Sequence, residues 1–372
     1  MKFKYFLFIC LFLFIRNSVS SYYSPTIFSN KYYYRTSTSI SLGRSSTGIT
    51  DDLSWVLTNP AAGNLVNGTF NFQLDTSYME NKWPYELTSD SKTTHNISIV
   101  FLGMSFKKNK WSINLLYNVN YDLTIKNHII TYDGEKEGIS WLRNNIFKSS
   151  FGYCVKDNFH IGLGIDYSSY KFLEQDQRGI YWNAYGFKYI IGIIYKINEN
   201  FIIDFSYDSN LNLYDNPSPF DMIETAVLRE SYEFNFPESY RFGVFYQMKK
   251  IKLYSNIDYH KFEKFHCDFD NKLNPLPAFP DIIETKDYRS ILNLSLGLEF
   301  KLNEYLMLRT GVFRNENNLY VYDQYLGKYD YGCTLGIGIK YKTIAFNLGF
   351  ETTTFLEKES INNIYFGFVY KK

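Results

Sequence analysis

The sequence contains little cysteine or histidine, and neither sign of charge is in excess. Its 372 residues include 4 Cys and 5 His, and 39 Lys and Arg stand against 38 Asp and Glu, a net charge of +1. A balance this even gives no electrostatic basis for a nucleic-acid partner. The cysteines are scattered, so we expect neither a disulfide framework nor a metal site at them. They are Cys10, Cys154, Cys267 and Cys333.

Long hydrophobic runs are also missing. The apolar run Tyr5–Ile15 is shorter than the roughly 20 residues that a helix needs to cross a bilayer. Lys2 and Lys4 precede this run, and the small residues Ser18-Val19-Ser20 follow it. This order is typical of a cleaved signal peptide and predicts a signal at residues 1–20. A signal anchor is the less favoured alternative.

Beyond residue 20, the sequence offers no segment that could cross a membrane as a helix. Such a chain can remain in a membrane only as a closed barrel, because lipid cannot satisfy an open sheet edge. What the sequence has in abundance is aromatic residues, 20% of the chain, with 35 Tyr and 33 Phe. Tyr and Phe favour half-buried strands, and Tyr also favours the membrane interface. An AT-rich genome would produce the same excess, so composition alone does not decide the fold.

Strict alternation of apolar and polar residues recurs through the body of the chain. From Leu292 to Leu302 every even position is Leu or Phe, whereas every odd position is polar, charged or glycine. The segments Tyr331–Tyr341 and Ile344–Phe350 repeat this pattern. Runs of about ten residues with a period of two are typical of barrel strands, which turn apolar side chains outward and polar ones inward.

The pattern predicts an all-β fold, a transmembrane outer-membrane β-barrel of about 14 antiparallel strands with an N-terminal plug. The expected strands cover residues 68–79, 95–106, 111–123, 146–155, 158–171, 184–196, 199–209, 238–249, 251–263, 289–302, 304–315, 328–341, 343–354 and 361–371. Short connections alternate with long ones, as periplasmic turns alternate with extracellular loops. An even strand number places both termini on the periplasmic side. The alternative, a soluble β-sandwich or repeat protein, does not explain this alternation.

Aromatic residues flank the short turns and predict a girdle at one membrane interface. The pairs are Phe106 and Trp111, Tyr153 and Phe159, Tyr195 and Phe201, Tyr246 and Tyr254, and Phe300 and Tyr305. The last expected strand carries Ile364, Phe366, Phe368 and Tyr370 on one face. It resembles the aromatic C-terminal signature of outer-membrane barrels, from which Lys371 and Lys372 depart.

Residues 21–67 lack the strand pattern and carry turn-forming and charged residues instead. These are Gly43, Arg44, Gly48, Asp51, Asp52, Asn59, Pro60 and Ala61. Their order resembles the N-terminal hatch of the long-chain fatty acid transporter family, the FadL-type outer-membrane transport proteins. The resemblance implies a 14-stranded barrel whose lumen is closed by the hatch. We therefore expect a signal peptide (1–20), a hatch (21–67) and a barrel (68–372).

The chemistry of these residues suits a plug. Arg44 can bind a carboxylate through two parallel hydrogen bonds. The candidate acids are Asp51, Asp52, Glu299 and Glu351. Gly43 and Gly48 allow tight turns in a crowded lumen, and Pro60 is expected to end a short helix over Asp51–Leu57. We favour a role in holding the hatch in place over direct contact with a ligand.

The resemblance implies passive uptake of hydrophobic compounds such as long-chain fatty acids. In that family the ligand rests in an apolar pocket above the hatch and leaves through a gap in the barrel wall. The candidate pocket and gap residues are Phe101, Leu102, Gly103, Met104, Ile190 and Ile194. An interrupted alternation at Phe101–Gly103 predicts a bulge that opens a lateral gap beside the second strand. We expect a monomer whose partners are membrane lipid and a hydrophobic, fatty acid-like small molecule.

No catalytic residue, cofactor or metal is expected. The run His266-Cys267-Asp268 lies in a predicted loop without a second ligand pair, and His260 near Asp258 lacks a serine motif. Two other functions remain open. A FadL-related adaptor of a secretion system would bind cargo proteins through apolar loop patches, for which Pro217–Phe220 and Leu273–Phe279 are candidates. A general porin needs a wide wet lumen, normally of about 16 or more strands, so a plugged barrel of 14 argues against it.

Overall fold

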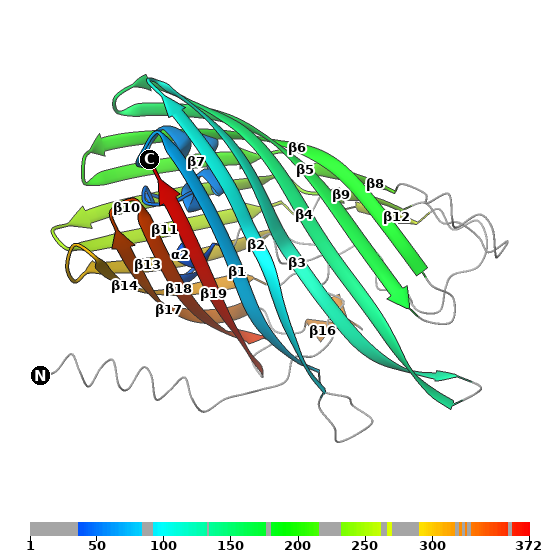
Figure 1. Ribbon diagram of the computed structural model, residues 1–372. Coiled ribbons are helices and arrows are strands. Elements are labelled where there is room, and N and C mark those ends of the chain that lie inside the picture. Colours follow the sequence, from blue (N-terminus) through cyan, green and yellow to red (C-terminus); the bar gives the residue numbers. More distant parts are fainter. Residues whose placement is uncertain are drawn as a thin grey trace, which may run out of the picture.

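The sheet of this protein closes on itself. The computed structural model describes residues 36–83, 92–131, 134–175, 180–215, 232–261, 266–269, 290–316, 320–321, 324–325, 329–355 and 359–372. Within these ranges, 17 strand segments form a single sheet, and its last segment, β19 (Glu359–Lys371), pairs antiparallel with its first, β1 (Phe70–Trp83). Three barrel strands are each broken into two segments. The result is a closed barrel of fourteen antiparallel strands (Figure 1), which confirms the predicted fold class.

The strand bounds follow the chain around the barrel. The other unbroken strands are β2 (Lys92–Lys108), β3 (Trp111–Thr131), β4 (Gly134–Lys156), β5 (Phe159–Gln175), β6 (Ile180–Asn198), β13 (Ile291–Lys301), β14 (Leu306–Glu316), β17 (Tyr329–Tyr341) and β18 (Ile344–Phe355). The broken ones are β7 (Phe201–Asp208) with β8 (Leu211–Asp215), β9 (Tyr232–Phe236) with β10 (Ser239–Met248), and β11 (Ile251–His260) with β12 (His266–Phe269). A separate ladder joins β15 (Tyr320–Val321) to β16 (Gln324–Tyr325).

Apolar side chains cover the outside of the barrel. Leu296, Leu298 and Phe300 on β13 are exposed, whereas Asn293 and Glu299 on the same strand are buried toward the lumen. The alternation predicted from the sequence therefore sets the two faces as expected. An outward apolar surface on a closed sheet suits a bilayer, because neighbouring strands pair their backbone groups and apolar side chains meet the lipid.

The predicted aromatic girdle is present, but the prediction was wrong for one residue. Phe106, Tyr153, Tyr195 and Tyr246 are exposed on the outer face near the short turns. Tyr254, which we predicted beside them, is instead buried in the lumen with 2% of its surface exposed. On β11 the odd-numbered Ile251, Ile257 and Tyr259 face outward, so an even-numbered residue must face inward.

Several strands are longer than predicted. The expected loop at residues 124–145 is largely strand, since β3 and β4 pair from Trp111↔Tyr153 to Thr131↔Gly134. The run His266-Cys267-Asp268, predicted in a loop, lies on β12 and pairs with β9. Backbone pairing with a neighbouring strand can extend a hairpin even where the apolar alternation fades, and the alternation was the signal used to set the bounds.

The segment before β1 lies inside the barrel. It contains the helices α2 (Ser37–Ser41) and α3 (Ser54–Thr58) and the 3₁₀ helix η2 (Pro60–Asn64). All three lie at the end of the barrel that carries the short turns and the C-terminus (Figure 1). Among the described residues, each helix is too short to cross a membrane. We call residues 36–67 the hatch segment; the predicted signal at 1–20 and the first part of the predicted hatch lie outside the described residues.

An apolar core joins the hatch segment to one side of the barrel. Trp55, Leu53 and Val56 of the hatch segment are fully buried and belong to one cluster with barrel residues. The barrel residues of the cluster are Phe101, Leu116, Ile194, Ile202, Phe245 and Tyr254. They come from β2, β3, β6, β7, β10 and β11, where polar lumen residues would be usual. Burial of this surface fixes the hatch segment against that half of the wall.

Candidate functional site

Arg44 anchors the hatch segment to β18. Its Nε and Nη2 atoms donate to the two carboxylate oxygens of Glu351, each at 2.9 Å. The guanidinium also lies 3.8 Å from the centre of the Phe313 ring. Gly43 and Arg44 both adopt positive φ angles, 65° and 69°, which turns the chain toward the wall. The prediction that Arg44 binds a carboxylate is confirmed, and Glu351 is the partner among the four candidate acids.

Asp51 and the C-terminus form a second anchor at the mouth of the barrel. Asp51 Oδ1 accepts from Lys371 Nζ at 2.9 Å and from Lys340 Nζ at 3.1 Å. Burial alone would raise the pKa of Asp51, but the ammonium groups of Lys371, Lys252 and Lys340 hold that pKa well below its usual range. Lys371, which departs from the usual C-terminal signature, therefore has a role in this chain: it ties the last strand to the hatch segment.

The remaining motif residues shape the hatch backbone. Asp52 accepts from the backbone nitrogen of Ser54 at 2.8 Å, at the start of α3. Asn59 ends α3, and its side chain accepts from the backbone nitrogen of Ala61 at 3.0 Å. Pro60 begins η2 and α3 ends at Thr58, one residue beyond the predicted end, but α3 begins only at Ser54 and not at the predicted Asp51. These contacts shape the hatch backbone, and the structural role that we favoured for its motif residues stays a prediction.

The sequence did not reveal a buried acid that binds the hatch segment on the wall opposite β18. Asp204 on β7 accepts from Trp55 Nε1 at 2.5 Å and from Thr47 Oγ1 at 3.0 Å. The carboxylate is 1% exposed. A signal was present in the sequence, because Asp204 interrupts the apolar run of β7, but its partners could not be identified from spacing.

Inward-facing glycines of the barrel wall allow the hatch backbone to pack directly against the strands. The sequence did not reveal this feature either. A Cβ atom at Gly297 would lie 2.8 Å from Leu42 Cβ, and one at Gly311 would overlap the backbone nitrogen of Gly43. On the other side, a Cβ atom at Gly162 would overlap the backbone of Pro60 and Ala61. The hatch segment thus approaches the wall at the closest distance that the backbones allow.

The six candidate pocket residues do not form one open pocket. Phe101 and Ile194 are fully buried in the core that holds the hatch segment. Gly103 faces the same core, where a Cβ atom would lie 2.8 Å from Leu53 Cδ1. Leu102 is 37% exposed on the outer face, so it cannot line the lumen, and this part of the prediction is corrected. Successive side chains of β2 point inward and outward in turn after the bulge, so Leu102 must face outward where Phe101 and Gly103 face inward.

Met104 and Ile190 complete the six. Met104 stands two residues from Leu102, on the same outward side of β2, and is partly exposed. Ile190 on β6 is fully buried and faces inward. Only Phe101, Gly103, Ile190 and Ile194 therefore face the interior, and the predicted apolar pocket is filled, at Phe101, Gly103 and Ile194, by the hatch segment.

The predicted bulge in the second strand is present and coincides with a break in the wall. The pairing of β1 with β2 shifts between Asp75↔Phe101 and Thr76↔Ile99, which leaves Val100 as the extra residue. Opposite it, the pairing of β3 with β4 shifts between Val119 and Tyr121. In the described parts of both strands, the β2–β3 ladder runs only from Phe101↔Asn118 to Lys108↔Trp111. Beyond this point each strand pairs with its outer neighbour alone.

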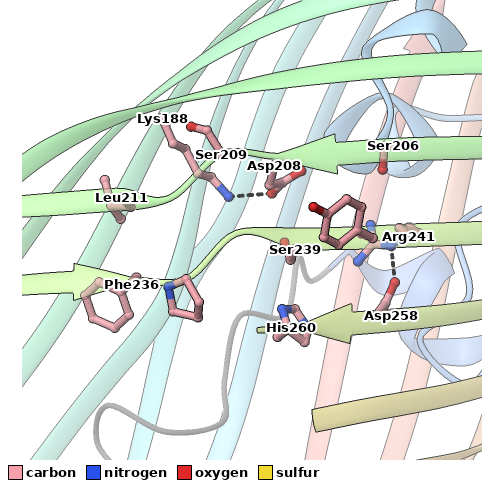
Figure 2. Close-up of a pocket in the computed structure, with 12 residues that line it drawn as sticks. Lys188, Ser206, Asp208, Ser209, Leu211, Phe236, Ser239, Arg241, Asp258 and His260 are labelled. Carbon is pink, nitrogen blue, oxygen red and sulfur yellow. Dashed lines mark hydrogen bonds and ion pairs between the residues drawn. The ribbon is translucent and has the colours of Figure 1, made fainter. Parts of the chain in front are cut away.

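A polar cavity lies across the lumen from the β2–β3 break. It is placed where β7 is separated from β8 and where β9 is separated from β10 (Figure 2). Lys188 Nζ donates to Asp208 at 2.6 Å, and Arg241 Nε pairs with Asp258. Leu211 and Phe236 provide an apolar wall beside these charges. The free volume is about 30 Å³. This is room for roughly two water molecules.

The charges of this cavity connect with the hatch segment. Lys188 also lies 3.8 Å from Asp166, which lies 3.6 Å from Lys148. Lys148 Nζ in turn donates to the backbone carbonyl of Leu57 in α3. Arg241 and Asp258 line a second, smaller cavity as well, together with Arg44 of the hatch segment. The Arg241–Asp258 pair thus stands between the two cavities.

Comparisons with known proteins give the fold. No family model matches the chain, and no curated protein matches it. A FadL homologue from Pseudomonas aeruginosa superimposes with a TM-score of 0.66 at 11% identity, over 92% of this chain and 99% of that one. The Pseudomonas putida toluene transporter TodX gives 0.62 at 14%, over 90% and 97%. The Ralstonia pickettii toluene transporter TbuX gives 0.60 at 13%, over 91% and 98%. The chain has the fold of FadL-type outer-membrane barrels, as the hatch motif predicted.

Proposed function

We propose that this protein is a channel of the bacterial outer membrane for passive uptake of hydrophobic compounds. The break between β2 and β3 is the observation that carries the proposal. It begins at Phe101↔Asn118, beside the core of the hatch segment, and both strands carry a bulge at the same level. A compound stopped above the hatch segment would leave sideways through this break into the membrane, and the closed hatch would block water-soluble molecules.

The class of compound is proposed only as hydrophobic. Long-chain fatty acids are the class that the hatch motif implies, whereas the names of two structural neighbours specify toluene. We further propose that the barrel acts as a monomer in contact with lipid, because the β1–β19 pairing closes the barrel between the first and last strands of one chain. The apolar patches suggested for an adaptor lie outside the described residues, so nothing on the described barrel favours that function.

A crosslink across the break tests the proposed route. In a background with the native cysteines replaced by serine, Ile99→Cys and Tyr121→Cys would be joined by a short bifunctional reagent. Uptake of a labelled hydrophobic compound into cells should be lost after crosslinking and recover when a cleavable crosslink is cut. The matched control is Met104→Cys with Leu115→Cys, which lie opposite each other where the β2–β3 ladder is intact. Undiminished uptake through the crosslinked Ile99–Tyr121 barrel would rule out the lateral route.

A further inference from the structure

The cavity at Lys188 and Arg241 combines an apolar wall with two charges of each sign. Phe236 is buried and its ring stacks on that of Tyr170, with centroids 5.6 Å apart and planes inclined by 14°. Leu211 is 2% exposed beside it. The hydroxyl-bearing residues Ser206, Ser239 and Tyr240 line the same cavity. An apolar surface that leads into a small polar end is the shape that fits the head of an amphipathic molecule.

Each charge in the cavity already has an opposite charge in contact. Lys188 and Asp208 have side chains 7% and 12% exposed and lie 2.6 Å apart. Arg241 and Asp258 have side chains 16% and 18% exposed and are in direct contact. Pairs that are this well shielded from water keep their charges matched, because a carboxylate or ammonium without a partner is costly in such a place. The cavity therefore offers hydrogen bonds but no net charge.

A carboxylate that entered this cavity would meet Asp208 and Asp258 at close range. It could reach Lys188 or Arg241 only by displacing the acid already bound to that cation. An ammonium group would meet the same difficulty at Lys188 and Arg241. A hydroxyl or carbonyl group would leave both pairs intact and form hydrogen bonds to their outer atoms or to the hydroxyl groups of Ser206 and Ser239.

From this arrangement we infer that the cavity is a binding site for the uncharged polar head of an amphipathic ligand, such as an alcohol, and that it selects against the carboxylate of a fatty acid. The inference rests on the proposed uptake function and makes its substrate class specific. The free volume of about 30 Å³ admits a head group alone. The side chains of Leu211 and Phe236 form the apolar border of this head-group site.

Three probes of equal chain length test the inference on the full-length protein held in amphipol. Radiolabelled 1-dodecanol, dodecanoate and dodecylammonium would be bound at pH 8, where the acid is ionised, and binding to amphipol alone subtracted. We expect the alcohol to bind at least about tenfold more tightly than either ion, because either ion would have to disturb one of the two charge pairs. Equal or tighter binding of dodecanoate would overturn the inference and leave the uptake function standing. Failure to bind any probe would overturn the inference, whereas the uptake function is tested separately by the crosslink across the β2–β3 break.

A charge variant supplies the second measurement. Asp258→Asn removes the carboxylate that is paired with Arg241, so affinity for dodecanoate should rise about tenfold relative to affinity for 1-dodecanol. Glu304→Gln, which removes one negative charge from an exposed short turn, is the matched control and should change neither. Heat-dependent mobility in gel electrophoresis shows that each barrel is folded. An unchanged ratio of acid to alcohol affinity in Asp258→Asn would also overturn the inference.

Discussion

Replacement of Arg44 by alanine is the sharpest test of how the hatch segment is held. The substitution removes two hydrogen bonds of 2.9 Å to Glu351 and leaves that carboxylate, whose side chain is 1% exposed, without its guanidinium partner. Breaking one side of a buried pair costs about 3–5 kcal/mol. The barrel does not depend on the hatch segment for its backbone pairing, so the cost should appear in hatch docking. A cost of about 3 kcal/mol raises the ratio of undocked to docked hatch roughly 100-fold.

Single-channel conductance in planar bilayers measures this ratio. The wild-type barrel should show rare openings, and Arg44→Ala should show openings about 100 times as often at the same protein concentration and voltage. The double variant Arg44→Ala with Glu351→Ala is the control, since it also removes the carboxylate that has lost its guanidinium. Its openings should fall back toward the wild-type frequency. Circular dichroism should give the same strand content for all three proteins.

Two results would refute the reasoning. Openings of Arg44→Ala as rare as those of the wild type would show that the Arg44–Glu351 pair does not limit hatch release. A double variant that opens as often as the single variant would show that the loss of packing, including the contact of Arg44 with Phe313, outweighs the uncompensated charge. Either outcome would indicate that the apolar core around Trp55 contributes most to holding the hatch segment in the barrel.

Two further predictions concern the other anchors of the hatch segment. Gly311→Val places side-chain atoms where the backbone nitrogen of Gly43 lies, so it should raise channel openings, whereas Gly164→Ala, whose Cβ would first meet a proline ring carbon at 3.3 Å, should leave them near wild type. Asp51 has a native pKa below its unfolded value, so its pair with Lys371 stabilises docking fully above about pH 4 and loses that effect as the pH falls toward the native pKa. Lys371→Met should therefore move the acid-induced rise in conductance to higher pH, and an unshifted profile would contradict this role.

The local sequence pattern was sufficient to predict which face of most strands points outward and that a hatch segment precedes the barrel. The alternation of Leu292–Leu302 placed Leu296 and Leu298 outside and Glu299 inside, because successive side chains of a strand must point to opposite faces. The interrupted alternation near Phe101 located the bulge within one residue of Val100. Tyr254 was misplaced because an aromatic residue near a turn suits either face, and only the parity of its own strand decides between them.

Long-range partners could not be read from the sequence. Arg44 and Glu351 are 307 residues apart, and four acids were equally acceptable until the barrel closed. Asp204 finds Trp55, and Lys188 finds Asp208, only because strand register sets which inward side chains stand at the same height in the lumen. Thus the sequence by itself determined a membrane barrel with a plug, since side-chain period and turn residues are local properties. The tertiary structure alone decided which apolar side chains of the wall hold the hatch segment and which charges meet at the cavity beside Lys188 and Arg241, since both depend on which strands become neighbours.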